Sequence, residues 1–190
     1  EYSLLDGSCK IKELAARAKE LGMDSMAITD HGVMYGVIDF YRAARENGIK
    51  PIIGCEIYVA PGSRFDREAG SGEDRYYHMI LLAENNTGYQ NLMKIVSKGF
   101  VEGFYYKPRV DMEVLEKYHE GIIALSACLA GEVATDLRQE QYEKAKELLM
   151  MDTEETDIDA EVDFIHIPWV KNIYLAMLNG DENAFNEQLA

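Results

Sequence analysis

Hydrophobic positions in the first 150 residues follow two different periods. In some stretches apolar side chains recur every three or four residues, which is typical of one face of an amphipathic helix. We predict such helices at Ile11–Leu21, Tyr35–Asn47, Thr87–Gly103, Asp111–Tyr118 and Gln141–Met150. Between them lie short apolar runs rich in β-branched and aromatic residues. They predict strands at Ser25–Thr29, Ile52–Ala60, Tyr76–Ala83 and Ile122–Ser126.

Strands that alternate with helices predict βα units, and therefore an α/β fold with a parallel sheet buried on both faces. Glycines mark two of the expected helix ends, at Gly22 and Gly48. Asp111 is a candidate N-cap for a third helix, because its carboxylate can accept a free backbone N–H. Residues 61–75 are charged and rich in glycine, so we expect a mobile surface loop there.

The residues after 150 break this pattern. Residues 151–163 are acidic and nearly free of apolar anchors, which predicts a linker or disordered stretch. Beyond them, Val170–Leu178 and Asp181–Leu189 have the pattern of two short helices. The sequence therefore divides into a folded region at 1–150 and an acidic, partly helical appendage at 151–190.

Composition narrows the class of protein. The chain has 190 residues, of which 47% are hydrophobic, enough for a substantial core, and its formal net charge is −15. The appendage has ten acidic residues and one basic residue, and the first 150 residues have 24 and 18. Neither part has the basic character of an independent DNA-binding domain. Three sparse cysteines favour a reducing compartment, and we expect Cys9 and Cys55 to be small buried hydrophobes.

Side chains that commonly bind metal ions occur just after, or within, the predicted strands. They are Asp6, Asp30, His31, Glu56, His78 and Cys128. In a barrel of parallel strands, side chains at the carboxyl ends of the strands gather at one face. A mixture of carboxylate, imidazole and thiolate suits Zn²⁺, with Mn²⁺ or Fe²⁺ as alternatives.

Each of these residues has an ordinary alternative role. Asp6 and Asp30 lie next to or near glycines and can be turn residues. His78 and Cys128, taken alone, are explained as core residues. Glu56 is harder to explain in this way, because a lone carboxylate inside an apolar strand is costly to bury.

Four segments of the chain are distinctive as a set. They are EYSLLDG, AITDHGVMYGVIDFYRAARENGIKPIIGCEIYVAP, RYYHMILLAENNTGYQNLMKIVSKGFVEGFYYKPRVD and EGIIALSACLAGE. Together they resemble the PHP (polymerase and histidinol phosphatase) domain that opens the alpha subunit of bacterial replicative DNA polymerase III. The resemblance covers residues 1 to about 150 and does not extend to 151–190.

This resemblance implies an incomplete (β/α) barrel. The family has an H-x-H pair just before the segment that matches EYSLLDG, and a late D-x-H pair from one of the last barrel strands. Neither pair is present in this chain. We therefore expect a truncated PHP domain at 1–150.

The resemblance also implies a metal centre. Asp6, His31, Glu56, His78 and Cys128 match ligand positions of the family one by one. We expect a divalent metal, with Zn²⁺ favoured, and only partial occupancy because both histidine pairs are missing. Asp30 is expected to orient a metal-bound imidazole. In some family members such a site performs phosphoester hydrolysis, including 3′-to-5′ exonuclease proofreading, and in others it has decayed.

As a whole, the resemblance implies the N-terminal PHP region of a DNA polymerase III alpha subunit, acting in DNA replication in the cytoplasm, with no polymerase active site in this chain. The implied partners are the rest of the alpha subunit and other replisome subunits, with DNA contacted indirectly and no membrane. Two alternatives stay open: a stand-alone metal-dependent phosphoesterase or 3′–5′ exonuclease, and a catalytically inert interaction module. A metal assay separates these two, because an inert module is indifferent to chelation.

A small aromatic and basic cluster lies outside this ligand set. It consists of Tyr105, Tyr106, Lys107 and Arg109. Aromatic rings and cations close together are typical of single-stranded nucleic-acid contacts, so Tyr106, Lys107 and Arg109 are candidate contacts. A packed loop is the alternative.

Overall fold

The computed structural model describes residues 1–67 and 76–150 of the chain. Its contacts divide the chain into two units, Glu1–Gly131 and Glu132–Ala190. The described residues of the first unit form the helices α1 (Ile11–Glu20), α2 (Val37–Glu46), α3 (Asn86–Val101) and α4 (Met112–Tyr118). Its strands are β1 (Ser25–Ile28), β2 (Lys50–Val59), β3 (Tyr77–Ala83), β4 (Phe104–Tyr105), β5 (Lys107–Val110) and β6 (Ile122–Leu125). The second unit contains α5 (Glu132–Arg138) and α6 (Tyr142–Met150).

The sheet of the first unit is built around β2. The strand order is β4-β5-β2-β3-β6, and β1 pairs with the first half of β2. β1 and β5 run parallel to β2, whereas β3 runs antiparallel to β2, and β6 antiparallel to β3. The fold is α/β as predicted, but the prediction of a wholly parallel sheet is wrong. Hydrophobic periodicity reports which side chains are buried and carries no information on strand direction.

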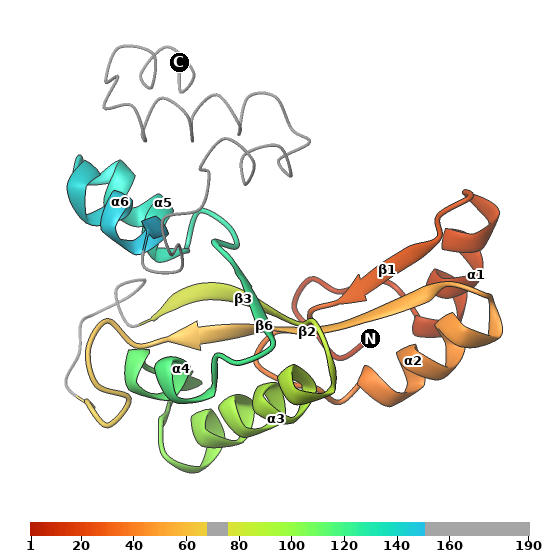
Figure 1. Ribbon diagram of the computed structural model, residues 1–190, viewed down its shortest axis with the longest axis horizontal. Coiled ribbons are helices and arrows are strands. Elements are labelled where there is room, and N and C mark those ends of the chain that lie inside the picture. Colours follow the sequence, from red (N-terminus) through yellow and green to blue (C-terminus); the bar gives the residue numbers. More distant parts are fainter. Residues whose placement is uncertain (68–75, 151–190) are drawn as a thin grey trace. The chain divides into compact units, whose positions relative to one another are not determined.

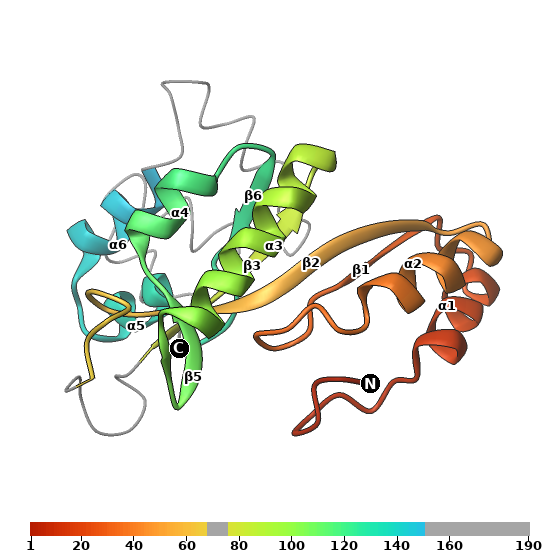
Figure 2. The same cartoon turned by 90° about the horizontal axis from the view of Figure 1, so that it is seen from below.

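Strand β2 is long enough to join two hydrophobic cores (Figures 1 and 2). At its start, α1 and α2 pack on β1 and β2 around Phe40 and Ile49. At its end, α3 covers the face of β2 and β3 that carries Cys55, Ile57 and Leu81. The opposite face of β2 presents Glu56 and Tyr58, because successive side chains of a strand alternate between faces.

The predicted elements of the first unit are confirmed with shifts of a few residues at their ends. Gly22 and Gly48 follow α1 and α2 with φ of 77° and 68°, the left-handed conformation that ends a helix. Asp111 caps α4 as predicted, its carboxylate accepting the Val114 N–H. The sequence reading missed the β4–β5 hairpin and α5.

Burial departs from the sequence expectation in two places. β6 was expected to be buried on both faces, yet Ile123 and Leu125 are both 46% exposed. Cys55 is fully buried as expected, whereas Cys9 is exposed. In the described part of the chain no helix is long and apolar enough to cross a membrane. The linker expected at 151–163 and the two helices expected after it lie outside the described residues.

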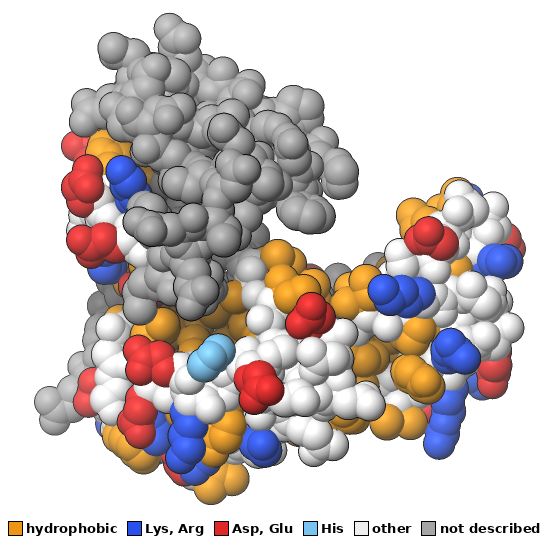
Figure 3. Space-filling model, viewed as in Figure 1, with side chains coloured by type: hydrophobic (Ala, Val, Ile, Leu, Met, Phe, Trp, Pro, Cys, Tyr) orange, Lys and Arg blue, Asp and Glu red, His pale blue; other side chains and the backbone are white. Residues whose placement is uncertain are grey.

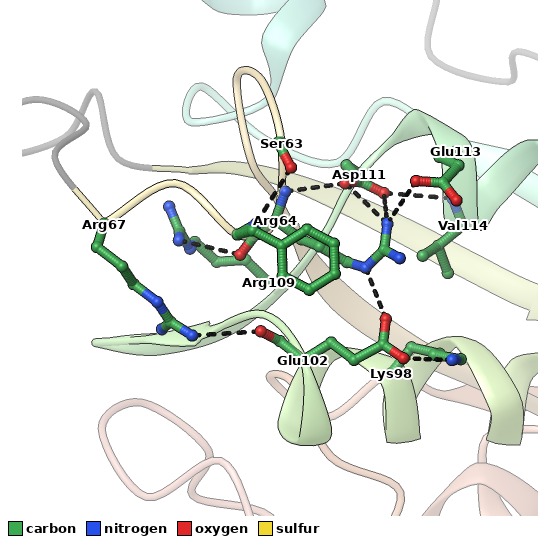
Figure 4. Close-up of polar contacts among 10 residues, drawn as sticks. Ser63, Arg64, Arg67, Lys98, Glu102, Arg109, Asp111, Glu113 and Val114 are labelled. Atoms are coloured by element: carbon green, nitrogen blue, oxygen red, sulfur yellow. Dashed lines mark hydrogen bonds and ion pairs between the residues drawn. The ribbon is translucent and has the colours of Figure 1, made fainter.

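A buried arginine anchors the segment that follows β2 (Figure 4). The Arg64 side chain is 8% exposed and forms ion pairs with Glu102 at 2.8 Å, Asp111 at 2.9 Å and Glu113 at 3.0 Å. The Arg64 backbone N–H also donates to Asp111 at 2.8 Å. Residues 61–67 form a surface loop as expected, and the buried Arg64 guanidinium anchors this loop at the ends of α3 and α4. The rest of the predicted loop, 68–75, lies outside the described residues.

We expect Arg64→Ala to lower the free energy of unfolding by about 3–5 kcal/mol, because it leaves the buried Asp111 carboxylate without its cation. Arg17→Ala is the matched control. Arg17 and Glu20 form an ion pair at 2.8 Å with both side chains 65% exposed, so its loss should cost about 0.5 kcal/mol or less. Urea unfolding followed by circular dichroism measures both. Equal losses in the two variants would contradict the anchoring role of Arg64.

Candidate metal centre

Glu56 lies at the middle of the candidate site. It is 8% exposed, and its Oε1 lies 2.7 Å from His31 Nδ1 and 3.1 Å from His78 Nδ1. Backbone pairing fixes both imidazoles beside it. His31 forms a parallel bridge with Glu56 just beyond β1. His78 lies on β3 opposite Tyr58, on the same face of the sheet as Glu56.

Asp6 and Cys128 extend the arrangement at either end. Both carboxylate oxygens of Asp6 lie 3.0 Å from His31 Nε2, and Cys128 Sγ lies 3.5 Å from His78 Nδ1. A backbone hydrogen bond from His78 N to Ala130 O, at 3.0 Å, holds the Cys128 turn against β3. The five predicted ligands therefore form one continuous series of contacts, from Asp6 through His31, Glu56 and His78 to Cys128.

Asp30 has a different position from the one expected. Its Oδ1 accepts a hydrogen bond from Ser3 Oγ at 2.7 Å, and Ser3 Oγ in turn accepts the His31 backbone N–H at 3.2 Å. Asp30 is 9% exposed. Its hydrogen bond is thus made to Ser3 and not to an imidazole, and it orders the backbone of His31 through that hydroxyl.

His31 is held between two carboxylates. An ionised carboxylate only accepts hydrogen bonds, so both contacts are satisfied as hydrogen bonds only when the imidazole carries two protons. Burial lowers the pKa of His31, but the hydrogen bonds to Asp6 and Glu56 outweigh it and leave the pKa above its ordinary value of 6.5. In this geometry a metal ion has to replace a proton to bind His31.

The donor types fit a divalent cation, and the geometry fits it only in part. Two imidazoles, two carboxylates and a thiol match the ligands that Zn²⁺ takes in proteins. Their contacts, however, join the five side chains in successive pairs and do not arrange them around one common point. Among the residues that the structure describes, no three His, Cys, Asp or Glu side chains are arranged as a group that could hold a metal ion.

An aromatic wall, which sequence reasoning missed, covers the His78 side of the site. Tyr58 is 5% exposed, and its ring centroid lies 5.3 Å from that of His78. Tyr76 stacks parallel to His78 at 5.9 Å. Burial, followed by the charge of Glu56, raises the pKa of Tyr58 to about 12, so it stays protonated near neutrality. Tyr58 is two residues from Glu56 on β2, so the two side chains lie on the same face of the strand. This spacing is the sequence signal that could have identified Tyr58 as part of the site.

The three candidate nucleic-acid contacts separate into two environments. Arg109 is fully buried, and its guanidinium donates to the carbonyls of Gly103, Arg64 and Asp66. A side chain with no exposed surface has none to offer to a nucleic acid, so the packed alternative describes Arg109. Tyr106 is 62% exposed at the turn between β4 and β5, and Lys107 is partly exposed beside it.

A mixed sheet with helices packed on it, and a series of metal-type side chains that different strands and turns bring together, is the arrangement of a candidate metal-binding α/β domain. The comparisons identify its family. The chain belongs to the PHP domain family, whose model matches residues 1–154.

The chain is similar to the N-terminal region of DNA polymerase III subunit alpha. The protein of that name from Treponema pallidum is 52% identical over 146 residues, 77% of this chain. The one from Aquifex aeolicus is 51% identical over 136 residues, 69% of this chain. The chain spans about 12% of the length of these curated relatives.

One solved structure shows a limited likeness. It is a Bifidobacterium adolescentis protein proposed to be a metal-dependent phosphoesterase, with 22% identity and a TM-score of 0.35. The match covers 50% of this chain and 29% of that one.

We predict that His31 titrates above pH 6.5 in protein kept in chelator, because two carboxylates stabilise its charged form. Glu56→Gln should lower the midpoint by removing one of them. NMR titration of the imidazole protons measures it, with the exposed His119 as the control that Glu56→Gln leaves unchanged. The stabilising contribution of His31 is complete below pH 6.5 and is lost as pH rises through the raised midpoint. A His31 midpoint at or below 6.5 would contradict the double carboxylate contact.

Proposed function

We propose that this chain acts as the PHP region of a bacterial replicative DNA polymerase III alpha subunit, with a weak divalent-metal site and no polymerase active site of its own. The family match and the curated relatives support the setting. The observation that carries the site is the contact of one buried carboxylate, Glu56, with both His31 and His78. The proposed partners are the rest of the alpha subunit and other replisome subunits in the cytoplasm.

The proposed fold of residues 1–150 is an incomplete PHP-type barrel. The open, mixed sheet around β2 supports an α/β core of this kind. We further propose that residues 151–190 are an acidic appendage of this domain, on the strength of their composition.

The residues proposed to hold the metal are Glu56, His31 and His78, with Asp6 and Cys128 at the ends. Zn²⁺ is favoured by the imidazole and thiol donors, and Mn²⁺ or Fe²⁺ is favoured if the oxygen and nitrogen donors dominate. When bound, such an ion supplies Lewis-acid activation of water and of a phosphoester. Weak binding is expected because the donors already satisfy one another by hydrogen bonds.

The chain itself orders the donors of this site. Glu56 holds both imidazoles by its position on β2, and Asp30 orders the backbone of His31 through Ser3. Tyr58 and Tyr76 pack against the His78 ring and limit its orientations. These contacts fix the donor positions before any ion or substrate arrives, and such preorganisation is what a metal site needs from its surroundings.

We predict substoichiometric metal in purified protein after dialysis, at fewer than about one ion per chain, since a tightly held Zn²⁺ needs about four protein ligands around one point. Elemental analysis by mass spectrometry measures it. Glu56→Gln and His78→Ala should lower the content further, and His119→Ala should leave it unchanged. Three tightly held ions per chain would show that the donor set is complete.

We predict no DNA synthesis, because the proposed domain has no polymerase active site. We also predict at most trace shortening of a 3′-labelled primer, because pairwise donors do not position the closely spaced ions of a two-metal reaction. The assay adds Mn²⁺ or Zn²⁺ in excess and compares the parent with His31→Ala, His78→Ala and His119→Ala. Vigorous metal-dependent shortening that both site variants abolish, and that His119→Ala retains, would replace this proposal with an active exonuclease.

A further inference from the structure

We propose that the tip of the β4–β5 hairpin, formed by Tyr106 and Lys107, binds single-stranded nucleic acid beside the metal centre. Tyr106 supplies a ring on which a base stacks, and Lys107 supplies an ammonium group for an adjacent phosphate. Single-stranded nucleic-acid sites combine these two elements. The inference deepens the proposed function by naming the substrate class of that site, and it rests on that function only for what the strand would do there.

The turn of this hairpin exposes the ring of Tyr106, and its backbone has a strained conformation there. Phe104 pairs with Pro108 and Tyr105 pairs with Lys107, so Tyr106 alone connects the two strands. Its φ is 61°, in the left-handed region that bulky residues rarely adopt. Glycine would fit this turn without strain, yet the position carries a tyrosine that is 62% exposed. Strained residues of this kind concentrate at functional sites.

The ring of Tyr106 rests on a rigid support. It packs edge-to-face on Tyr105, with ring centroids 4.7 Å apart and an interplanar angle of 75°. The Arg109 and Arg67 guanidinium carbons lie 5.0 Å and 6.0 Å from the centre of the Tyr105 ring. Arg109 is itself buried and bonded to backbone carbonyls. The exposed ring is therefore held in position before any base arrives.

Lys107 connects the tip to the metal centre. Its Nζ lies 5.2 Å from the centre of the Tyr58 ring, the ring that packs on His78. A Cβ added at Gly32, next to His31, would come within 2.8 Å of Tyr58 and 3.2 Å of Pro108. The hairpin is thus closely packed against Tyr58 of β2 and against Gly32, the neighbour of His31. A nucleic-acid strand bound at its tip would therefore lie close to the candidate ligands.

Charge argues that the contact is small. The formal net charge of the chain is −15. Even on the face in Figure 3, acidic side chains lie between the Lys and Arg side chains, and Asp6 and Glu56 lie in the site itself. A long polyanion gains little from such a surface. Stacking on Tyr106 depends less on net charge than phosphate contacts do, which favours a short single strand over an acidic peptide as the ligand.

The test uses the full chain and a fluorescein-labelled oligothymidylate of about twelve nucleotides, followed by fluorescence anisotropy at low salt. EDTA is present throughout, so the result does not depend on metal binding or hydrolysis. Tyr106→Gly should weaken binding about 5- to 100-fold, while Tyr106→Phe keeps it. Glycine tolerates the positive φ, so this variant should fold at least as well as the parent. Lys107→Gln should reduce the salt dependence by about one phosphate contact.

Two exposed residues on the helices of the first core provide matched controls, Tyr41 on α2 and Lys12 on α1. Tyr41→Ala and Lys12→Gln should bind as the parent does, since both residues lie on α1 or α2. An abasic oligomer of equal length should bind the parent about as weakly as oligothymidylate binds Tyr106→Gly. The proposal is wrong if Tyr106→Gly binds like the parent, if the abasic oligomer binds as tightly as the thymidylate, or if only a glutamate-rich peptide binds.

Discussion

The arrangement of the first unit depends on one buried carboxylate in the middle of one strand. Strand β2 begins in the core around Phe40 and ends in the core around Leu92 and Ile95. Glu56 lies between these cores, where parallel pairing brings His31 to one side and antiparallel pairing brings His78 to the other. A shift of β2 by one residue would turn Glu56 into the core against α3 and separate it from both imidazoles, because strand side chains alternate between faces.

Burying Glu56 also explains why the donors bind one another. A carboxylate with little exposed surface needs charged or hydrogen-bonding partners, and His31 and His78 provide them. The same partners are the donors that a divalent ion would use. Protons and metal therefore compete for the same atoms, and the site is ordered whether or not an ion is present. This competition links the raised pKa of His31 to the weak metal binding that we propose.

Hydrophobic periodicity predicted the positions of the main elements. The five residues of the contact series were predicted through the resemblance to the PHP family, since no local pattern singles them out. Glu56 and His78 share a face only through antiparallel pairing of β2 and β3, a direction that no local pattern encodes. The role of Arg64 was hidden for a similar reason, since its partners Glu102 and Asp111 lie about forty residues away in the chain. The hydrogen bond between Ser3 and Asp30 could not be predicted either, because it joins residues 27 positions apart in the chain.

Two arginines show how this acidic chain distributes its positive charge. Arg64 forms ion pairs with three carboxylates at helix ends, and Arg109 donates to backbone carbonyls beneath the β4–β5 hairpin. Both guanidinium groups are buried, so neither adds to the basic charge of the surface. These arginines order the backbone around them. Arg64 holds residues 61–67 to the ends of α3 and α4, and Arg109 on β5 holds the carbonyls of Gly103 and Asp66 beside the hairpin. An exposed ring on such a base can bind by stacking, whose strength depends on preorganisation more than on net charge.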